Sequence, residues 1–194
     1  MELERFQESL RTSLKSSSVI YMDKLELNIE RLEDSGAKTN EMITLLLTAN
    51  SDGTVPKFFV ITPYDFSIKL PSNIHSVTTF KGKLNAYSLY QWFNVCLKSS
   101  FSHFKKLVVS QKYKMLSSNN FVEMAKENSI ESLTFPEGSN CFLNPFRKIT
   151  PEILKLFEGK QFDLPLQLAF DGIEESIKSL VKKYRDDFDI FKAL

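Results

Sequence analysis

The stretch MITLLLTANSDGTVPKFFVIT, residues 42–62, contains the clearest local structural signal in the chain. Its two apolar, β-rich runs, 42–48 and 55–62, flank the polar tetrapeptide Asn50–Gly53, which has the composition of a hairpin loop. Pro56 suits the first position of a strand or an edge strand, because proline cannot donate to a central ladder. We therefore predict an antiparallel hairpin.

Two further runs extend this pattern towards the C-terminus. Residues 66–70 alternate Phe, Ile and Leu with Ser and Lys, and residues 74–80 follow the turn-forming segment Pro71–Asn73. Alternation of apolar and polar residues is typical of antiparallel strands with one solvated face. The sequence thus predicts a four-stranded antiparallel meander.

The first 35 residues show helical spacing instead. Apolar residues recur every three or four positions on both sides of a serine cluster at 16–18, and Gly36 is a helix-stop signal. We predict two amphipathic helices, which either bind a partner protein as a short coiled coil or pack on their own domain. Their apolar stripe is the predicted partner-binding set: Leu3, Phe6, Leu10, Met22, Leu25, Ile29 and Leu32.

The second half reads mainly as helix. Residues 84–109 carry a broad apolar face and are expected to form a long helix across the sheet. A short helix is expected at 120–128, an extended segment at 130–135, and further helices from Thr150 and from 171 or 172. The predicted fold class is α+β: N-terminal helices, a four-stranded antiparallel meander, a long helix across the sheet and further C-terminal helices. Residues 1–36 would form a helical extension and 37–194 a single domain.

Composition bounds the class of protein. A chain of 194 residues with 42% hydrophobic residues and two cysteines can bury a core without staples, which excludes collagen-like, disordered and disulfide-scaffold classes. The acidic N-terminus lacks the features of a secretory signal, and the longest charge-free run, 84–97, is too short and too polar to span a membrane. We expect reduced cysteines and a cytoplasmic or nuclear location.

Catalytic and cofactor motifs are sparse. The glycines lie at least 13 positions apart, so no glycine-rich phosphate loop can be drawn. Neither His75 nor His103 is part of a metal-binding motif, and the two cysteines form no CxxC pair. Cys96 is expected to be a buried apolar residue, and Cys141 follows a turn without an identified base. The sequence therefore predicts no catalytic residues, no metal and no cofactor.

Charge is strongly segregated although the net charge is only +1. Residues 66–122 contain no Asp or Glu and carry a net charge of +8, whereas 1–65 sum to −4 and 123–194 to −3. Lysines without arginines contact anions without reading base edges. This segment either binds an acidic protein surface, binds a nucleic-acid backbone or pairs with the acidic ends of the chain. The predicted anion-binding residues are Lys98, Lys105, Lys106, Lys112 and Lys114.

These observations lead to three hypotheses about function. The first is a non-enzymatic interaction subunit or adaptor of an intracellular complex, which binds other protein subunits as a homo- or hetero-oligomer. The alternative is a sequence-nonspecific nucleic-acid-binding subunit. The second alternative is a thiol-dependent enzyme using Cys141 or Cys96.

Overall fold

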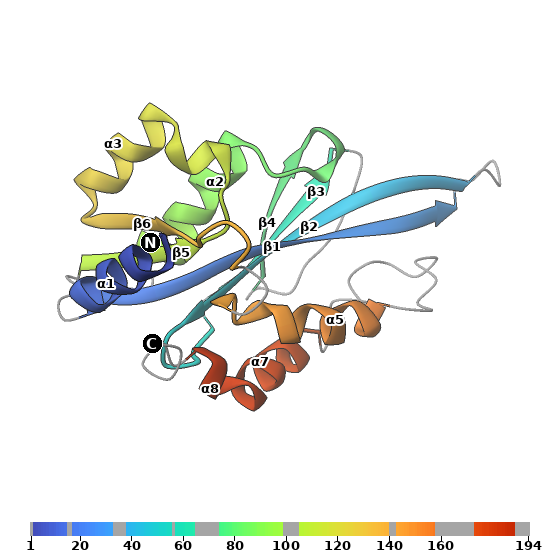
Figure 1. The fold of residues 1–194 in the computed structure, drawn as a ribbon. Helices are drawn as coiled ribbons and strands as arrows, with labels where there is room; N and C mark the ends of the chain where they lie inside the picture. Colours follow the sequence, from blue (N-terminus) through green and yellow to red (C-terminus); the bar gives the residue numbers. More distant parts are fainter. Residues whose placement is uncertain are drawn as a thin grey trace.

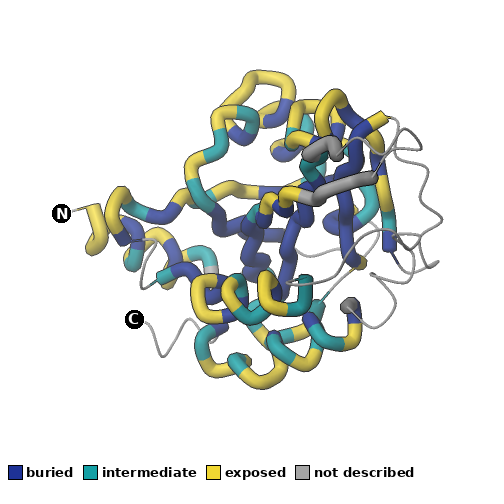
Figure 2. The backbone as a smooth tube through the Cα atoms, turned by 90° about the vertical axis from the view of Figure 1, so that its right-hand side faces the viewer, coloured by how far each residue is buried: buried dark blue, intermediate teal, exposed yellow. Residues whose placement is uncertain are grey.

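The computed structural model describes residues 2–14, 17–32, 38–55, 57–64, 74–98, 105–139, 143–157 and 173–188. A mixed sheet forms the middle layer, and helices lie on both of its faces (Figure 1). Figure 2 shows buried residues gathered along the strands and exposed residues on the outer turns of the helices. None of the described helices is long and apolar enough to cross a membrane.

The sheet has six strands in the order β4-β3-β2-β1-β5-β6. Strands β1, β2 and β3 pair antiparallel, whereas β4 is parallel to β3, β5 is parallel to β1, and β6 is parallel to β5. Their bounds are β1 Ser17–Leu32, β2 Lys38–Asn50, β3 Phe58–Pro63, β4 Ile74–Thr79, β5 Lys105–Ser110 and β6 Ile130–Thr134.

The helices divide between the two faces of the sheet. Helices α1, α5, α7 and α8 contribute to one apolar core, and α2, η2, η3 and α3 contribute to the other. The short η1 helix follows β4. Their bounds are α1 Glu2–Leu14, η1 Phe80–Gly82, α2 Ala86–Trp92, η2 Phe93–Lys98, η3 Lys114–Ser117, α3 Asn119–Glu127, α5 Phe146–Phe157, α7 Ile173–Lys183 and α8 Arg185–Phe188.

The sequence explains why β1 is central. Val19 and Tyr21 point into the core with α1 and α5, and the intervening Ile20 and Met22 point into the core with α2 and α3. All four side chains are at most 2% exposed. A strand covered on both faces needs this continuous apolar run, because successive side chains alternate between the faces.

Several predicted elements are confirmed. Residues 42–48 and 58–62 lie on neighbouring antiparallel strands, and the loop between them closes with hydrogen bonds from Gly53 N–H to Asn50 O at 2.9 Å and from Asn50 N–H to Thr54 O at 2.8 Å. The short helix near 120–128 and the extended segment near 130–135 correspond to α3 and β6. The mixed α/β character of the chain is therefore as expected.

Three expectations about the architecture are wrong. Residues 17–32, predicted as helix, form the long strand β1, so part of the predicted helical extension lies at the centre of the sheet. Of the described residues in the predicted helix 84–109, 86–98 are helical, whereas 105–109 belong to strand β5. The sheet is mixed and not an antiparallel meander, since β4 is parallel to β3. The strand predicted at 66–70 lies outside the described residues.

Candidate functional site

Asp23 is a buried carboxylate in the middle of β1, with only 6% of its surface exposed. Its Oδ1 accepts hydrogen bonds from the Tyr113 hydroxyl at 2.8 Å and from Gln111 Nε2 at 3.2 Å. The backbone N–H of Lys24 also donates to Oδ1, at 2.8 Å. Oδ2 accepts from Asn144 Nδ2 at 2.7 Å. We name Asp23, Gln111, Tyr113 and Asn144 the Asp23 cluster.

Strand pairing brings these distant residues together. β1 and β5 run parallel with Met22 opposite Ser110, so the chain leaves the end of β5 beside Asp23. Gln111 and Tyr113 are therefore the first residues after β5 that can reach the carboxylate. Asn144 lies two residues before helix α5 begins at Phe146. The cluster thus joins β1, the segment after β5 and the start of α5.

The hydrogen-bonding roles of the cluster are well defined. Burial, followed by the charge of Asp23, raises the pKa of Tyr113 well above its ordinary value near 10, so the phenol is neutral and donates its proton. The same hydroxyl oxygen accepts from Lys24 N–H at 3.2 Å. Asn144 accepts from Phe146 N–H at 3.0 Å through Oδ1, which directs its Nδ2 donor towards Asp23.

The cluster contains one carboxylate. The three side chains that surround Asp23 are two amides and a phenol, all acting as donors. Across the described part of the chain, no group of three or more His, Cys, Asp or Glu side chains is placed to hold a metal ion. Among the residues that the structure describes, Asp23 therefore meets hydrogen-bond donors and not further anionic ligands.

Exposed basic residues follow the cluster members in sequence. Lys112 and Lys114 flank Tyr113, and Arg147 lies in the first turn of α5; all three are exposed. Lys148 is exposed too, but its Nζ is 2.7 Å from Asp187 Oδ1. Lys112 and Lys114 belong to the acid-free stretch 66–122, so no acidic residue lies near them in sequence. They are accessible cations beside a buried polar centre.

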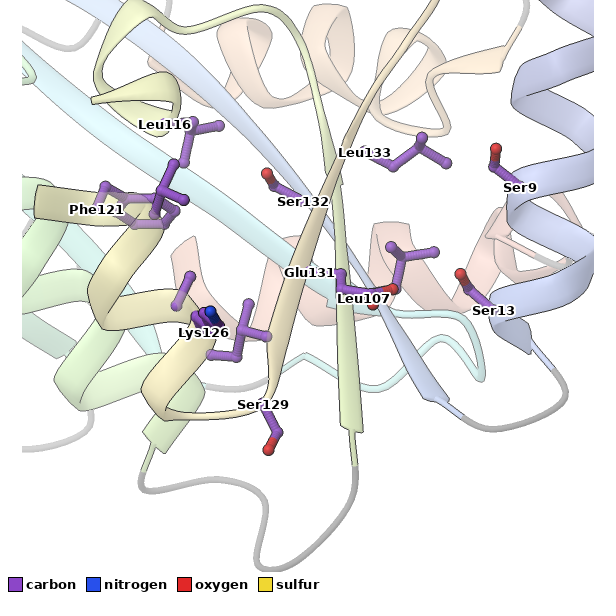
Figure 3. A pocket seen from close by; sticks show the side chains of 13 residues that line it. Ser9, Ser13, Leu107, Leu116, Phe121, Lys126, Ser129, Glu131, Ser132 and Leu133 are labelled. Carbon is purple, nitrogen blue, oxygen red and sulfur yellow. The ribbon is translucent and has the colours of Figure 1, made fainter. Parts of the chain in front are cut away.

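A groove runs along the edge strand β6, between α1 and α3. Figure 3 shows Ser9 and Ser13 on α1 across the groove from Phe121 and Lys126 on α3, with β6 between them. Its volume is about 630 Å³, and an adjoining pocket of about 680 Å³ is lined partly by Lys112 and Tyr113. Charged residues of both signs line the groove and the adjoining pocket: Glu2, Arg5, Lys112, Lys126, Glu131 and Glu137.

The predicted anion-binding lysines do not all share one accessible surface. Lys98, Lys112 and Lys114 are exposed. Lys106 is 5% exposed and donates from Nζ to the carbonyl oxygen of Leu97 at 2.8 Å. Burial lowers the pKa of Lys106 from its ordinary value. The side chain of Lys105 lies outside the described residues.

Most of the predicted partner-binding stripe lies in the cores. Phe6 and Leu10 are 6% and 1% exposed and belong to the core with α5, while Leu3 is 36% exposed. Met22 and Leu25 point to opposite faces of the sheet and are buried. The side chains of Ile29 and Leu32 lie outside the described residues. Phe6 and Leu10 thus attach α1 to its own sheet.

Cys96, the cysteine within the described residues, has the environment of an unreactive thiol. Cys96 is fully buried, and its Sγ donates to the carbonyl oxygen of Lys57 at 3.2 Å. Burial raises its pKa to about 12, so the thiolate that a nucleophile requires is scarce at neutral pH. Cys141 and His103 lie outside the described residues.

Sequence reasoning missed the whole Asp23 cluster. One available signal was Asp23 itself, because a charged residue between the apolar run Val19–Met22 and the buried Leu25 is costly to bury unless it has partners. The partners carry no comparable signal. Gln111, Tyr113 and Asn144 are ordinary residues that only the strand register and the path into α5 bring together.

Comparison with known proteins supports the fold assignment. No model of a protein family and no curated protein sequence matches the chain. Among solved structures, it is similar to a chain of the Mos1 strand transfer complex, with a TM-score of 0.55 and 11% identity over 94% of this chain and 59% of that one. A Mos1 transposase paired-end complex with left transposon end and a pre-cleavage Mos1 transpososome give TM-scores of 0.49 and 0.48, both at 11% identity over 95% of this chain. The chain spans about three-fifths of the length of these solved chains.

This similarity overturns two expectations from the sequence. The prediction of an interaction subunit or adaptor is contradicted, because the solved chain that matches with a TM-score of 0.55 belongs to a strand transfer complex. The prediction of a non-enzymatic chain is contradicted by the same similarity, because the fold is shared with a chain of that strand transfer complex. At 11% identity the likeness shows the fold alone.

Proposed function

We propose that the chain binds nucleic acid through its phosphate backbone, without reading base sequence. The observation that carries the proposal is the likeness of nearly the whole chain to a chain of a strand transfer complex. The binding surface is the exposed basic segment beside the Asp23 cluster, centred on Lys112 and Lys114. A nuclear location fits this proposal.

The chemistry of these side chains supports backbone contacts. Lysine ammonium groups act as compact point charges and lack the fixed fork with which arginine recognises guanine. Lys112 and Lys114 project from the short segment between β5 and α3, which follows the end of a central parallel strand. Arg147, in the first turn of α5, adds a third exposed cation three residues after Asn144.

Such binding has a measurable electrostatic signature. Each phosphate that a lysine neutralises releases a condensed counterion, so the logarithm of the affinity falls with the logarithm of salt concentration by about 0.9 per contact on duplex DNA. Removing two contacts should therefore reduce that slope by about 2 and weaken binding to unrelated sequences equally. A sequence-reading surface would instead discriminate between probes.

The experiment is fluorescence anisotropy with two 30-base-pair DNA duplexes of unrelated sequence, from low salt to near-physiological salt. We expect the wild-type chain to bind both duplexes with similar affinity. The double variant Lys112→Glu/Lys114→Glu should lose at least tenfold in affinity at low salt, with the shallower salt slope. Arg147→Gln should have a smaller effect in the same direction, because it removes one charge.

A charge-matched control separates a local surface from net charge. Lys155→Glu/Lys182→Glu changes two exposed lysines on α5 and α7 by the same total charge. We expect this variant to keep most of the wild-type affinity. Equal losses in both double variants would show that only net charge matters. No binding of either duplex by the wild-type chain at low salt would refute the proposal.

A further inference from the structure

The Asp23 cluster occupies a position where a cation must be considered. Enzymes that cut or join nucleic-acid strands commonly hold divalent cations between carboxylates, and Mg²⁺ prefers oxygen ligands. Asp23 is a buried carboxylate on a central strand of a fold that resembles a chain of a strand transfer complex. Whether its surroundings suit a cation is decided by the atoms that face it.

Those atoms are hydrogen-bond donors. Oδ2 accepts from Asn144 Nδ2, and Oδ1 accepts from the Tyr113 hydroxyl, from Gln111 Nε2 and from a backbone N–H. A cation bound to Asp23 would compete for the lone pairs that these donors occupy. It would also face the positive ends of their N–H and O–H dipoles, with no second carboxylate in the cluster to offset them.

Two of the three side chains make a second hydrogen bond that fixes their donor group towards Asp23. Asn144 Oδ1 already accepts from Phe146 N–H, so turning the amide to offer its oxygen to a cation would break both bonds. The Tyr113 oxygen already accepts from Lys24 N–H and keeps its proton for Asp23. Gln111 is half-buried and makes the longest of the three side-chain hydrogen bonds to Asp23, at 3.2 Å.

We infer that the Asp23 cluster is a hydrogen-bonded clamp that ties the start of α5 to the central strand, and that it does not take a divalent cation. The carboxylate satisfies donors from two separate segments, Gln111–Tyr113 and Asn144, that meet on β1. The clamp positions the first turn of α5, which carries the exposed Arg147. This inference does not depend on nucleic-acid binding.

Paramagnetic broadening by Mn²⁺ tests the wild-type chain directly. In a ¹⁵N-labelled sample, Mn²⁺ bound at Asp23 would selectively broaden the side-chain amide signal of Asn144 and the backbone signals of Asp23 and Lys24. We expect no preferential broadening of these signals up to equimolar Mn²⁺, with or without a DNA duplex. Selective broadening at this site would overturn the inference.

A gain-of-function variant tests the physical reason. Gln111→Glu replaces the amide whose Nε2 lies 3.2 Å from Asp23 Oδ1 with a second carboxylate, and two neighbouring carboxylates supply the oxygen ligands of a cation site. We expect calorimetry to show at least tenfold tighter Mn²⁺ binding than in the wild-type chain. The matched control Gln91→Glu alters a half-buried glutamine on α2 and should leave Mn²⁺ binding unchanged.

Each result of these Mn²⁺-binding measurements either supports or contradicts the inference. Wild-type binding as tight as that of Gln111→Glu would overturn the inference, because a single carboxylate would then suffice. Failure of Gln111→Glu to gain affinity would also count against it, since the donor set would then not decide cation binding. Equal gains in Gln111→Glu and Gln91→Glu would reflect added charge alone and would contradict the role of the cluster.

Discussion

Removing the Asp23 carboxylate should destabilise the chain more than removing any exposed acid. Asp23→Ala deletes the acceptor of three side-chain donors at 2.7 to 3.2 Å in a site that is 6% exposed. A hydrogen bond to a charged group contributes about 1.5 to 3 kcal/mol, and breaking a buried charged network costs about 3 to 5 kcal/mol. Since Gln111 can turn to solvent, we expect a loss of about 4 kcal/mol in the free energy of unfolding.

The partner substitution shows whether the residues act together. Asn144→Ala removes the 2.7 Å bond to Asp23 and the acceptor for Phe146 N–H, at a cost of about 2 to 3 kcal/mol. Asp23→Ala/Asn144→Ala should cost about 2 kcal/mol less than the two single losses added together, because their shared bond can be lost only once. That shortfall measures the clamp.

Urea unfolding provides the measurement. Trp92 is the chain's only tryptophan and is fully buried, so its fluorescence reports loss of the core with α2, and circular dichroism reports the helices. Asp52→Ala is the control, since the Asp52 carboxylate accepts two bonds from Thr54 in an exposed loop and should cost about 1 kcal/mol or less. Additive losses at Asp23 and Asn144, within about 0.5 kcal/mol, would refute the clamp.

Three further predictions follow from local geometry. Gly82→Ala should cost about 3 kcal/mol and lower the thermal midpoint by about 9 °C, because a Cβ there would lie 1.9 Å from the Met42 carbonyl oxygen at a φ of +64°; a shift under about 2 °C would contradict this. Burial lowers the pKa of Lys106 in the folded chain, so the unfolded chain binds more protons at alkaline pH. The free energy of unfolding should therefore rise with pH up to the ordinary lysine pKa near 10.5. Lys106→Met should flatten that rise and leave DNA binding unchanged. With its pKa at about 12, Cys96 in a Cys141→Ser chain should react with a thiol reagent only as fast as the chain unfolds, and rapid labelling in native buffer would disprove its burial.

Local sequence patterns were sufficient to predict the elements that depend mainly on residues close in sequence. The turn at Asn50–Gly53 has the predicted composition, and the antiparallel strands β2 and β3 lie on either side of it, although β3 begins at Phe58 and not at Val55. Helix α3 and strand β6 likewise lie within one residue of the predicted ranges, although the N-cap of α3 is Ser118 and not a residue of the predicted capping box. The apolar content of the chain also predicted a large core, which the structure divides between two faces of the sheet.

The same patterns misled where a strand is covered on both faces. Met22, Leu25 and Ile29 have helical spacing, but Val19–Met22 form a continuous buried run in the strand β1. A strand buried on both sides has no alternation to distinguish it from a buried helix. The direction of β4 escaped prediction for a different reason, because pairing direction depends on the path of the connection and not on the composition of the strand.

Composition and order along the chain were enough to establish a mixed α/β protein with a segregated charge and a lysine-rich, acid-free middle. Tertiary structure decided which of those charges are accessible: it buries Lys106 against a backbone carbonyl and leaves Lys112 and Lys114 exposed. It also brought Asp23 together with partners that lie 88 to 121 positions further along the chain. The physical reason is that burial and hydrogen bonding depend on which strands become neighbours, and that is a property of the whole sheet.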